Sequence, residues 1–220
     1  ISKKTPQASA KDKEGTVHKL WVVSDEKIIQ DISKSLSQKK IFIADGHHRY
    51  ETAWNYMQYL KNKSKNFSDK NEYGYVLAYL CPMEDSGISI WPTHRVIEDV
   101  SSIEENIEKY FDVLPAKSFE KLQKEEVQPI MIFKNGKYRT LKIKDVSILK
   151  KAMPGRCRAY RNLGVSILHS ILIPNVAADK YIYVKSDKEA VGLAKKNKKI
   201  AVLVPATPVE AIKEIALKNE

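Results

Sequence analysis

Strand-like and helical segments alternate along this chain, and this mixture is the feature that most constrains its fold. The strand-like runs cover residues 18–23, 41–44, 73–81, 88–97, 129–133, 137–143, 181–184 and 200–204. Turn-forming residues, among them Asn135-Gly136, separate two pairs of these runs and are typical of β-hairpins. The last two runs are each followed by a helical pattern. Hairpins together with strand–helix alternation predict an α+β fold, a mixed sheet with flanking helices.

The length of 220 residues suits one large domain or two small ones. Residues 1–16 show neither a hydrophobic period nor a capping signal, so we expect a flexible tail or linker remnant there. We expect residues 17–98 to form an α/β portion, which contains the polar phosphate-binding motif described below. Residues 99–220 form a second α/β portion, which we expect to pack on the first.

The composition narrows the classes of function. The formal net charge of +11 favours an anionic partner, because positive potential attracts phosphates and carboxylates. Much of the excess lies in lysine-rich stretches without interleaved aromatics, so we expect an anionic small molecule or nucleotide rather than nucleic acid. The two cysteines exclude a disulfide framework. No apolar run approaches the roughly 20 residues that cross a bilayer, so we expect a cytoplasmic protein without a membrane partner.

The polar motif Asp45-Gly46-His47-His48-Arg49 directly follows the apolar run at residues 41–44. That run is typical of a central strand, and helical spacing begins after the motif, so we expect a strand-to-helix turn. The first N–H groups of a helix have no partner within it and attract an anion. Glycine permits close approach of the backbone, histidines add donors, and arginine adds a planar fork that matches two phosphate oxygens.

Asp45 is the residue that suggests catalysis. A carboxylate repels phosphate unless it binds a metal ion or takes a proton from a hydroxyl, so the motif suits phosphoryl transfer. Asp45 and His48 are therefore the candidate catalytic residues, and Gly46, His47 and Arg49 are candidate substrate or nucleotide ligands. A simpler interpretation stays open, because aspartate is a common N-cap and the others could form a polar helix start. The adjacent histidines point in different directions, which disfavours a shared zinc ion.

The stretch from Ile43 to Ala53 resembles the signature of an uncharacterised bacterial and archaeal family, the "domain of unknown function 1015". Further matching stretches lie at residues 18–21, 92–96, 163–169 and 205–210, so the resemblance covers nearly the whole chain. Members of that family are longer, and the chain looks like the carboxyl-terminal portion of one. The resemblance implies no activity.

The motif itself is similar to one in archaeal ADP-dependent free serine kinases, which belong with the ParB and sulfiredoxin superfamily. That resemblance implies a ParB/sulfiredoxin-like portion around the motif. It implies phosphate-binding roles for Gly46, His47, His48 and Arg49, and a role for Asp45 near the transferred group. It implies ADP or ATP as phosphate donor, and Mg²⁺ is then expected as well. Sulfiredoxins carry a cysteine in the turn where this chain has histidine, and an upstream glutamate of the kinases has no placed counterpart.

A second polar group, Thr93-His94-Arg95, lies on a predicted strand, where alternation puts His94 on the face opposite to its two neighbours. An edge strand with polar residues toward water would explain the group equally well. The family resemblance favours a role in binding substrate or nucleotide. His169 lies among apolar residues, and we expect it to be a hydrogen-bonded helix residue rather than a ligand.

Three functions follow from these patterns. The leading one is a nucleotide-dependent small-molecule phosphotransferase, a kinase with an alcohol acceptor, in which His94 or Arg95 lines the acceptor side. The alternative is a ParB-like regulatory module that binds nucleotide or nucleic acid without small-molecule catalysis. The third is a binding domain that has lost catalysis. Under all three functions we expect four residues to lie in the core, because helical spacing or strand alternation directs their side chains inward: Ile41, Ile43, Trp54 and Met57.

Overall fold

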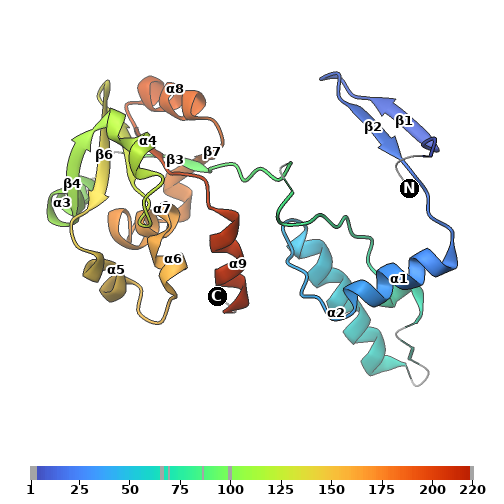
Figure 1. Ribbon diagram of the computed structural model, residues 1–220. Helices are drawn as coiled ribbons and strands as arrows, with labels where there is room; N and C mark the ends of the chain where they lie inside the picture. The colour runs from blue at the N-terminus through green and yellow to red at the C-terminus, as the bar shows by residue number, and fades with distance from the viewer. Residues whose placement is uncertain (1–3, 65–66, 69, 86, 99–100, 219–220) are drawn as a thin grey trace. The chain divides into compact units, whose positions relative to one another are not determined.

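The structure, a computed structural model, describes residues 4–64, 67–68, 70–85, 87–98 and 101–218. The chain forms two compact units, Ile1–Val76 and Leu77–Glu220 (Figure 1). We expected a junction between residues 98 and 99, and the boundary lies earlier. The reason is that the strand ending at Ile97 is part of the main sheet of the second unit, so the chain has entered that unit before residue 98.

The first unit contains one small hairpin and two main helices. Its elements are β1 (Ala8–Lys11), β2 (Val17–Leu20), α1 (Glu26–Leu36), α2 (His47–Lys63) and the short 3-10 helix η1 (Glu72–Gly74). β1 and β2 pair antiparallel, with Ala8 opposite Leu20. Our expectation of a flexible tail over residues 1–16 is therefore wrong for Ala8–Lys11, because pairing gives this polar segment the backbone hydrogen bonds that a tail would make to water.

The described helices of the first unit bury none of their residues. α1 is well capped, since the Asp25 side chain accepts hydrogen bonds from the N–H groups of Lys27 and Ile28, but its apolar face is exposed. Of the four expected core residues, Met57 is half-buried, whereas the other three are exposed: Ile41 by 60%, Ile43 by 40% and Trp54 by 50%.

The expected central strand at residues 41–44 is also absent. β1 and β2 pair only with each other among the described strands, so residues 41–44 have no ladder to join. A strand needs a partner for its backbone N–H and C=O groups, and apolar character alone does not supply one.

The second unit is a sheet with helices. Its strands are β3 (His94–Ile97), β4 (Phe111–Pro115), β5 (Ile130–Lys134), β6 (Lys137–Ile143), β7 (Tyr181–Val184) and β8 (Ile200–Leu203). Its α-helices are α3 (Ser101–Tyr110), α4 (Phe119–Leu122), α5 (Val146–Ala152), α6 (Arg158–Asn162), α7 (Gly164–Ile167), α8 (Asp187–Asn197) and α9 (Val209–Leu217). A π-helix, η3 (Leu168–Leu172), continues α7, and the 3-10 helices η2 (Ala116–Ser118) and η4 (Ala178–Lys180) complete the set.

The six strands follow the order β4-β6-β5-β8-β3-β7. The α+β class is confirmed. The sheet differs from the mixed sheet that we expected, because each pairing between its described strands is antiparallel. The β5–β6 connection is the hairpin expected at Asn135-Gly136, and both residues have positive φ, 49° and 78°. That geometry matches the right-handed twist of the paired strands, which explains the strength of the dipeptide as a signal.

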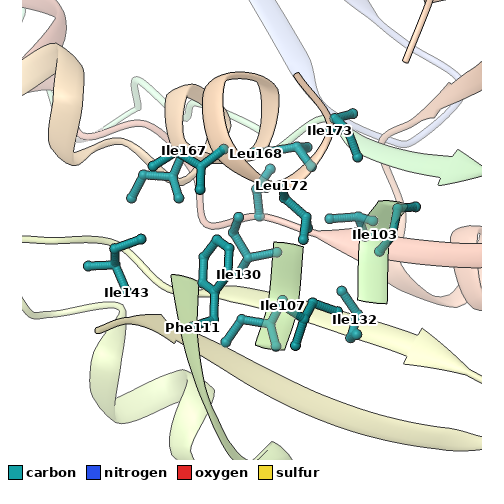
Figure 2. Close-up of a cluster of buried hydrophobic side chains, with 14 of the residues drawn as sticks. Ile103, Ile107, Phe111, Ile130, Ile132, Ile143, Ile167, Leu168, Leu172 and Ile173 are labelled. Atoms are coloured by element: carbon teal, nitrogen blue, oxygen red, sulfur yellow. The ribbon is translucent and has the colours of Figure 1, made fainter. Parts of the chain in front are cut away.

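The hydrophobic core lies on the two faces of this sheet. On one face, side chains from α3, β5 and the α7–η3 segment point toward one another, as Figure 2 shows for Ile107, Ile130 and Leu168. On the other face, α8 packs Ala190, Val191 and Ala194 against the sheet. Each fully buried isoleucine or leucine contributes about 1.5–3 kcal/mol by leaving water, so the second unit is the stable part of the described structure.

The hairpin expected from residues 73 to 97 is not seen in the described part of this range, residues 73–85 and 87–97. Among these residues only His94–Ile97 form a strand, while Leu77 and Tyr79 are fully or almost fully exposed. β3 pairs instead with β7 and β8, whose residues lie about a hundred positions further along the chain. Among the described residues, no helix has both the length and the apolar character to cross a membrane.

Candidate functional site

The motif at residues 45–49 forms the start of α2, as the sequence predicted. Gly46 is the N-cap residue and has left-handed backbone angles, φ 81° and ψ 24°, which glycine adopts without strain. Its carbonyl accepts the first hydrogen bond of the helix, from the N–H of Tyr50. Within the described residues no side chain caps this helix start. The N–H groups at the start of α2 are thus free of a side-chain acceptor, which is the condition for anion binding.

Arg49 folds back over this helix start. Its Nη2 donates to Oδ2 of Asp45 at 3.0 Å, and both side chains are largely exposed. The guanidinium also covers Gly46, because a Cβ atom at that position would lie 2.9 Å from Nη2 of Arg49. The Asp45–Arg49 pair is solvent-screened, so its contribution to stability is small and a ligand can exchange with it.

The two histidines of the motif are exposed. His48 places Nδ1 3.6 Å from Oε2 of Glu51, and together with Arg49 and Tyr56 it borders a shallow open hollow on the surface of α2. A phosphate at the helix start could accept hydrogen bonds from the imidazole, guanidinium and backbone N–H groups. These groups are exposed, so none of them has been desolvated in the absence of a ligand. The arrangement can hold an oxyanion, with Asp45 the acidic member beside it.

The structure changes one part of this expectation. The motif links an irregular segment to a helix, not a central strand to a helix, for the reason given above. The helix start alone therefore positions the donors. Among the described residues, no group of three or more histidine, cysteine, aspartate or glutamate side chains could hold a metal ion.

His94 is a buried residue of the second unit. Its side chain is 2% exposed, and its Nδ1 accepts a hydrogen bond from the N–H of Val204 at 3.3 Å. Its Nε2 lies 2.5 Å from Oδ1 of Asp187, the first residue of α8, although this contact lies outside hydrogen-bond geometry. Burial lowers the pKa of His94 more than the Asp187 carboxylate raises it. A neutral imidazole therefore joins β3 to the end of β8 and the start of α8.

Arg95 points to the opposite face of β3, as alternation predicted. It is 7% exposed, its Nη1 donates to the carbonyl of Thr93, and its guanidinium carbon lies 4.8 Å from the ring centre of Tyr183. Burial lowers the pKa of Arg95. β3 is an inner strand between β8 and β7, so the interpretation of an edge strand with polar residues toward water does not apply.

The predicted site residues fall into two groups that belong to different units, residues 45–49 in the first and residues 93–95 in the second. The sequence did not identify Asp187, Tyr181 and Tyr183 as neighbours of the second group, because they lie more than eighty positions away and carry no local motif. His169 was interpreted as a helix residue, and it lies in the π-helix η3 with its ring 5.6 Å from that of Tyr181.

The chain is similar to a protein family and to a solved structure. A protein-family model described as "Protein of unknown function (DUF1015)" matches residues 1–166. A solved structure described as a conserved hypothetical protein from Pyrococcus furiosus aligns with 89% of this chain and 79% of that chain, at 17% identity and a TM-score of 0.42. No curated protein matches.

Proposed function

This chain belongs to the DUF1015 family, whose description names no activity, and we propose from its own residues that it is a nucleotide-dependent small-molecule phosphotransferase. The proposed phosphate site is the start of α2. The observation that carries it is the left-handed Gly46 N-cap, which no described side chain caps, with the exposed Arg49 guanidinium folded over the same residue.

The donors at this site suit phosphate. A helix start offers backbone N–H groups and a positive dipole end, and the guanidinium of Arg49 adds two donors in one plane. His47 and His48 are exposed beside it. Because the Asp45–Arg49 pair is exposed, the arginine can exchange its carboxylate partner for a phosphate at little cost.

Asp45 has a chemical role in this proposal once Arg49 has moved to the phosphate. A free carboxylate beside a bound nucleotide can accept the proton of an acceptor hydroxyl or bind a divalent cation. We expect ADP or ATP as donor together with Mg²⁺, because the cation neutralises the charge that the carboxylate would otherwise repel. An alcohol-bearing small molecule is the proposed acceptor.

The alternative is a nucleotide- or nucleic-acid-binding module without catalysis, and the net charge of +11 favours it. Titration of the protein with ADP and ATP, with and without Mg²⁺, and with duplex DNA at several salt concentrations separates the proposal from a nucleic-acid-binding module. Turnover of the bound nucleotide in the presence of an alcohol separates it from a nucleotide-binding module without catalysis. The proposal expects saturable nucleotide binding that Mg²⁺ strengthens, and a shallow salt dependence. Absence of nucleotide binding, combined with DNA affinity that falls steeply with salt, would replace it by the alternative, because only a surface that neutralises many phosphates releases many counterions.

A further inference from the structure

Arg95 is a buried cation whose surroundings are neutral. Tyr183 lies directly opposite it on β7, with its ring stacked on the guanidinium, and the carbonyl of Thr93 accepts from Nη1. In the part of the chain that the structure describes, the buried Nε–H of Arg95 has no hydrogen-bond partner, and Arg95 forms no ion pair. A buried charge without an opposite charge is strongly disfavoured, so a compensating anion is expected at this place.

Two other arginines of the same unit have carboxylate partners, in contrast to Arg95. Arg139 is about one third exposed and forms two hydrogen bonds to the carboxylate of Glu104. Arg158 is mostly exposed and pairs with Glu126. Arg95 is more deeply buried than either, yet of these three arginines it is the one without a carboxylate partner among the described residues.

Three further side chains extend this surface. The ring centres of Tyr181 and Tyr183 are 5.3 Å apart, and His169 lies 5.6 Å from Tyr181. His169 belongs to η3, and single π-helical turns inside helical segments occur frequently at functional sites. Burial, together with the nearby Arg95, lowers the pKa of His169, so its imidazole is neutral at pH 7. The cluster thus combines one positive charge with hydroxyl and imidazole groups, which are able to form hydrogen bonds with a ligand.

We propose that Arg95, His169, Tyr181 and Tyr183 form a binding site for the carboxylate group of a small molecule. The proposal does not rest on the phosphate site at α2, which is in the other unit. The free Nε–H is one half of the guanidinium edge that binds the two oxygens of a carboxylate in parallel. A single positive charge matches a carboxylate monoanion, whereas a phosphate dianion would bring a second negative charge that nothing in the cluster compensates.

Tyr183 is the residue past which a ligand would reach Arg95. Its side chain covers the guanidinium, yet the residue is 55% exposed and belongs to β7, the last strand of the sheet. We expect rotation of this ring to expose the guanidinium without moving the sheet, because exposed side chains change rotamer on a timescale of nanoseconds or faster.

The test is an NMR titration of the full chain with acetate, and in parallel with inorganic phosphate, observed at the ring signals of His169 and Tyr183. We expect saturable shifts with acetate at lower concentration than with phosphate. Arg95→Lys keeps the charge and removes the two-pronged edge, so it is expected to raise the acetate dissociation constant about tenfold or more.

Arg156→Lys is the matched control. The Arg156 guanidinium also lies 4.8 Å from a tyrosine ring, that of Tyr160, but it is exposed. The Arg156→Lys substitution is expected to leave acetate affinity unchanged. Tyr183→Phe, which keeps the ring and the fold of an exposed position, is expected to weaken acetate binding severalfold through loss of the hydroxyl. Equal acetate affinity in Arg95→Lys and Arg156→Lys, tighter binding of phosphate than acetate at these signals, or no saturable shift at all would overturn the proposal.

Discussion

The backbone N–H of Val204 donates to Nδ1 of His94 across 110 positions of sequence. This contact fixes the state of the imidazole, because a ring nitrogen that accepts an N–H cannot carry a proton itself. The remaining proton is on Nε2, which faces the Asp187 carboxylate at 2.5 Å. One buried side chain therefore connects the end of β8, strand β3 and the start of α8 in a single protonation state.

We predict that the second unit loses stability in mild acid. His94 and His169 both have pKa values lowered by burial below the ordinary value of 6.5, so the unfolded chain binds more protons than the folded chain below that pH. The free energy of unfolding is then flat above pH 7 and falls as the pH drops below about 6.5, by at most about 1.4 kcal/mol per pH unit for each histidine. Chemical denaturation from pH 5 to 8 measures it.

The variants that isolate this effect are His94→Gln and His47→Gln. The first is less stable at pH 7, because Gln cannot reproduce both contacts, but its stability changes less between pH 7 and 5. The second removes an exposed histidine and keeps the pH profile of the unaltered protein. A profile that stays equally steep in His94→Gln would show that His94 does not titrate differently on folding.

A second prediction concerns Glu104, whose carboxylate accepts two hydrogen bonds from Arg139 and one from Lys134. The bonds to Arg139 are the main cause that lowers the pKa of Glu104 below its ordinary 4.5. A lowered carboxyl pKa stabilises the fold above pH 4.5, and this contribution is lost as the pH falls further. Glu104→Gln is expected to cost about 1 kcal/mol at pH 7, because the carboxylate is only partly buried. The difference from the unaltered protein should shrink between pH 5 and 3 in urea melts, and a constant difference would contradict the assignment.

Features that depend on a few neighbouring residues could be predicted from the sequence. The Asn135-Gly136 hairpin formed because its two positive φ angles suit these residues, and α5 and α8 begin after Asp145 and Ser186, whose side chains cap them. The start of α2 at His47 is of the same kind, since Gly46 supplies the backbone angle that the helix start requires. Each signal is contained in four residues or fewer.

Features that depend on distant partners could not be predicted. Residues 41–44 have the composition of a central strand, but strand formation requires a ladder, and none of the described strands provides one. The environment of Arg95 is set by Tyr183 and His169, which only the pairing of β3 with β7 and the packing of η3 bring near it. Local pattern thus located the candidate residues, while topology decided which are buried.

A third prediction tests the geometry of the helix start. Gly46→Ala forces a side chain onto a residue with φ 81° and places its Cβ against Nη2 of Arg49, so we expect weaker anion binding and a loss of about 1–2 kcal/mol of stability. Gly155→Ala is the matched control, because Gly155 has φ 82° with no atom within 4 Å of the added carbon. It should lose similar stability and keep its affinity for phosphate. Titration with inorganic phosphate and a thermal melt of both variants decide the point, and equal phosphate affinity in both would remove Gly46 from the site.

The last prediction is that Arg49→Ala abolishes or greatly weakens anion binding and leaves the fold intact. Arg49 is exposed at the start of α2, and its pair with Asp45 is exposed too, so no buried carboxylate is left behind when it is removed. A charge-assisted, two-pronged contact to phosphate is worth roughly one to two powers of ten in affinity. Lys34→Ala, which removes an exposed cation from α1, is the control for general loss of positive charge. Phosphate and nucleotide titrations paired with melting curves measure both effects. A large drop in melting temperature with unchanged affinity would mean that Arg49 serves the helix and not a ligand, and the phosphate site would then have to lie elsewhere.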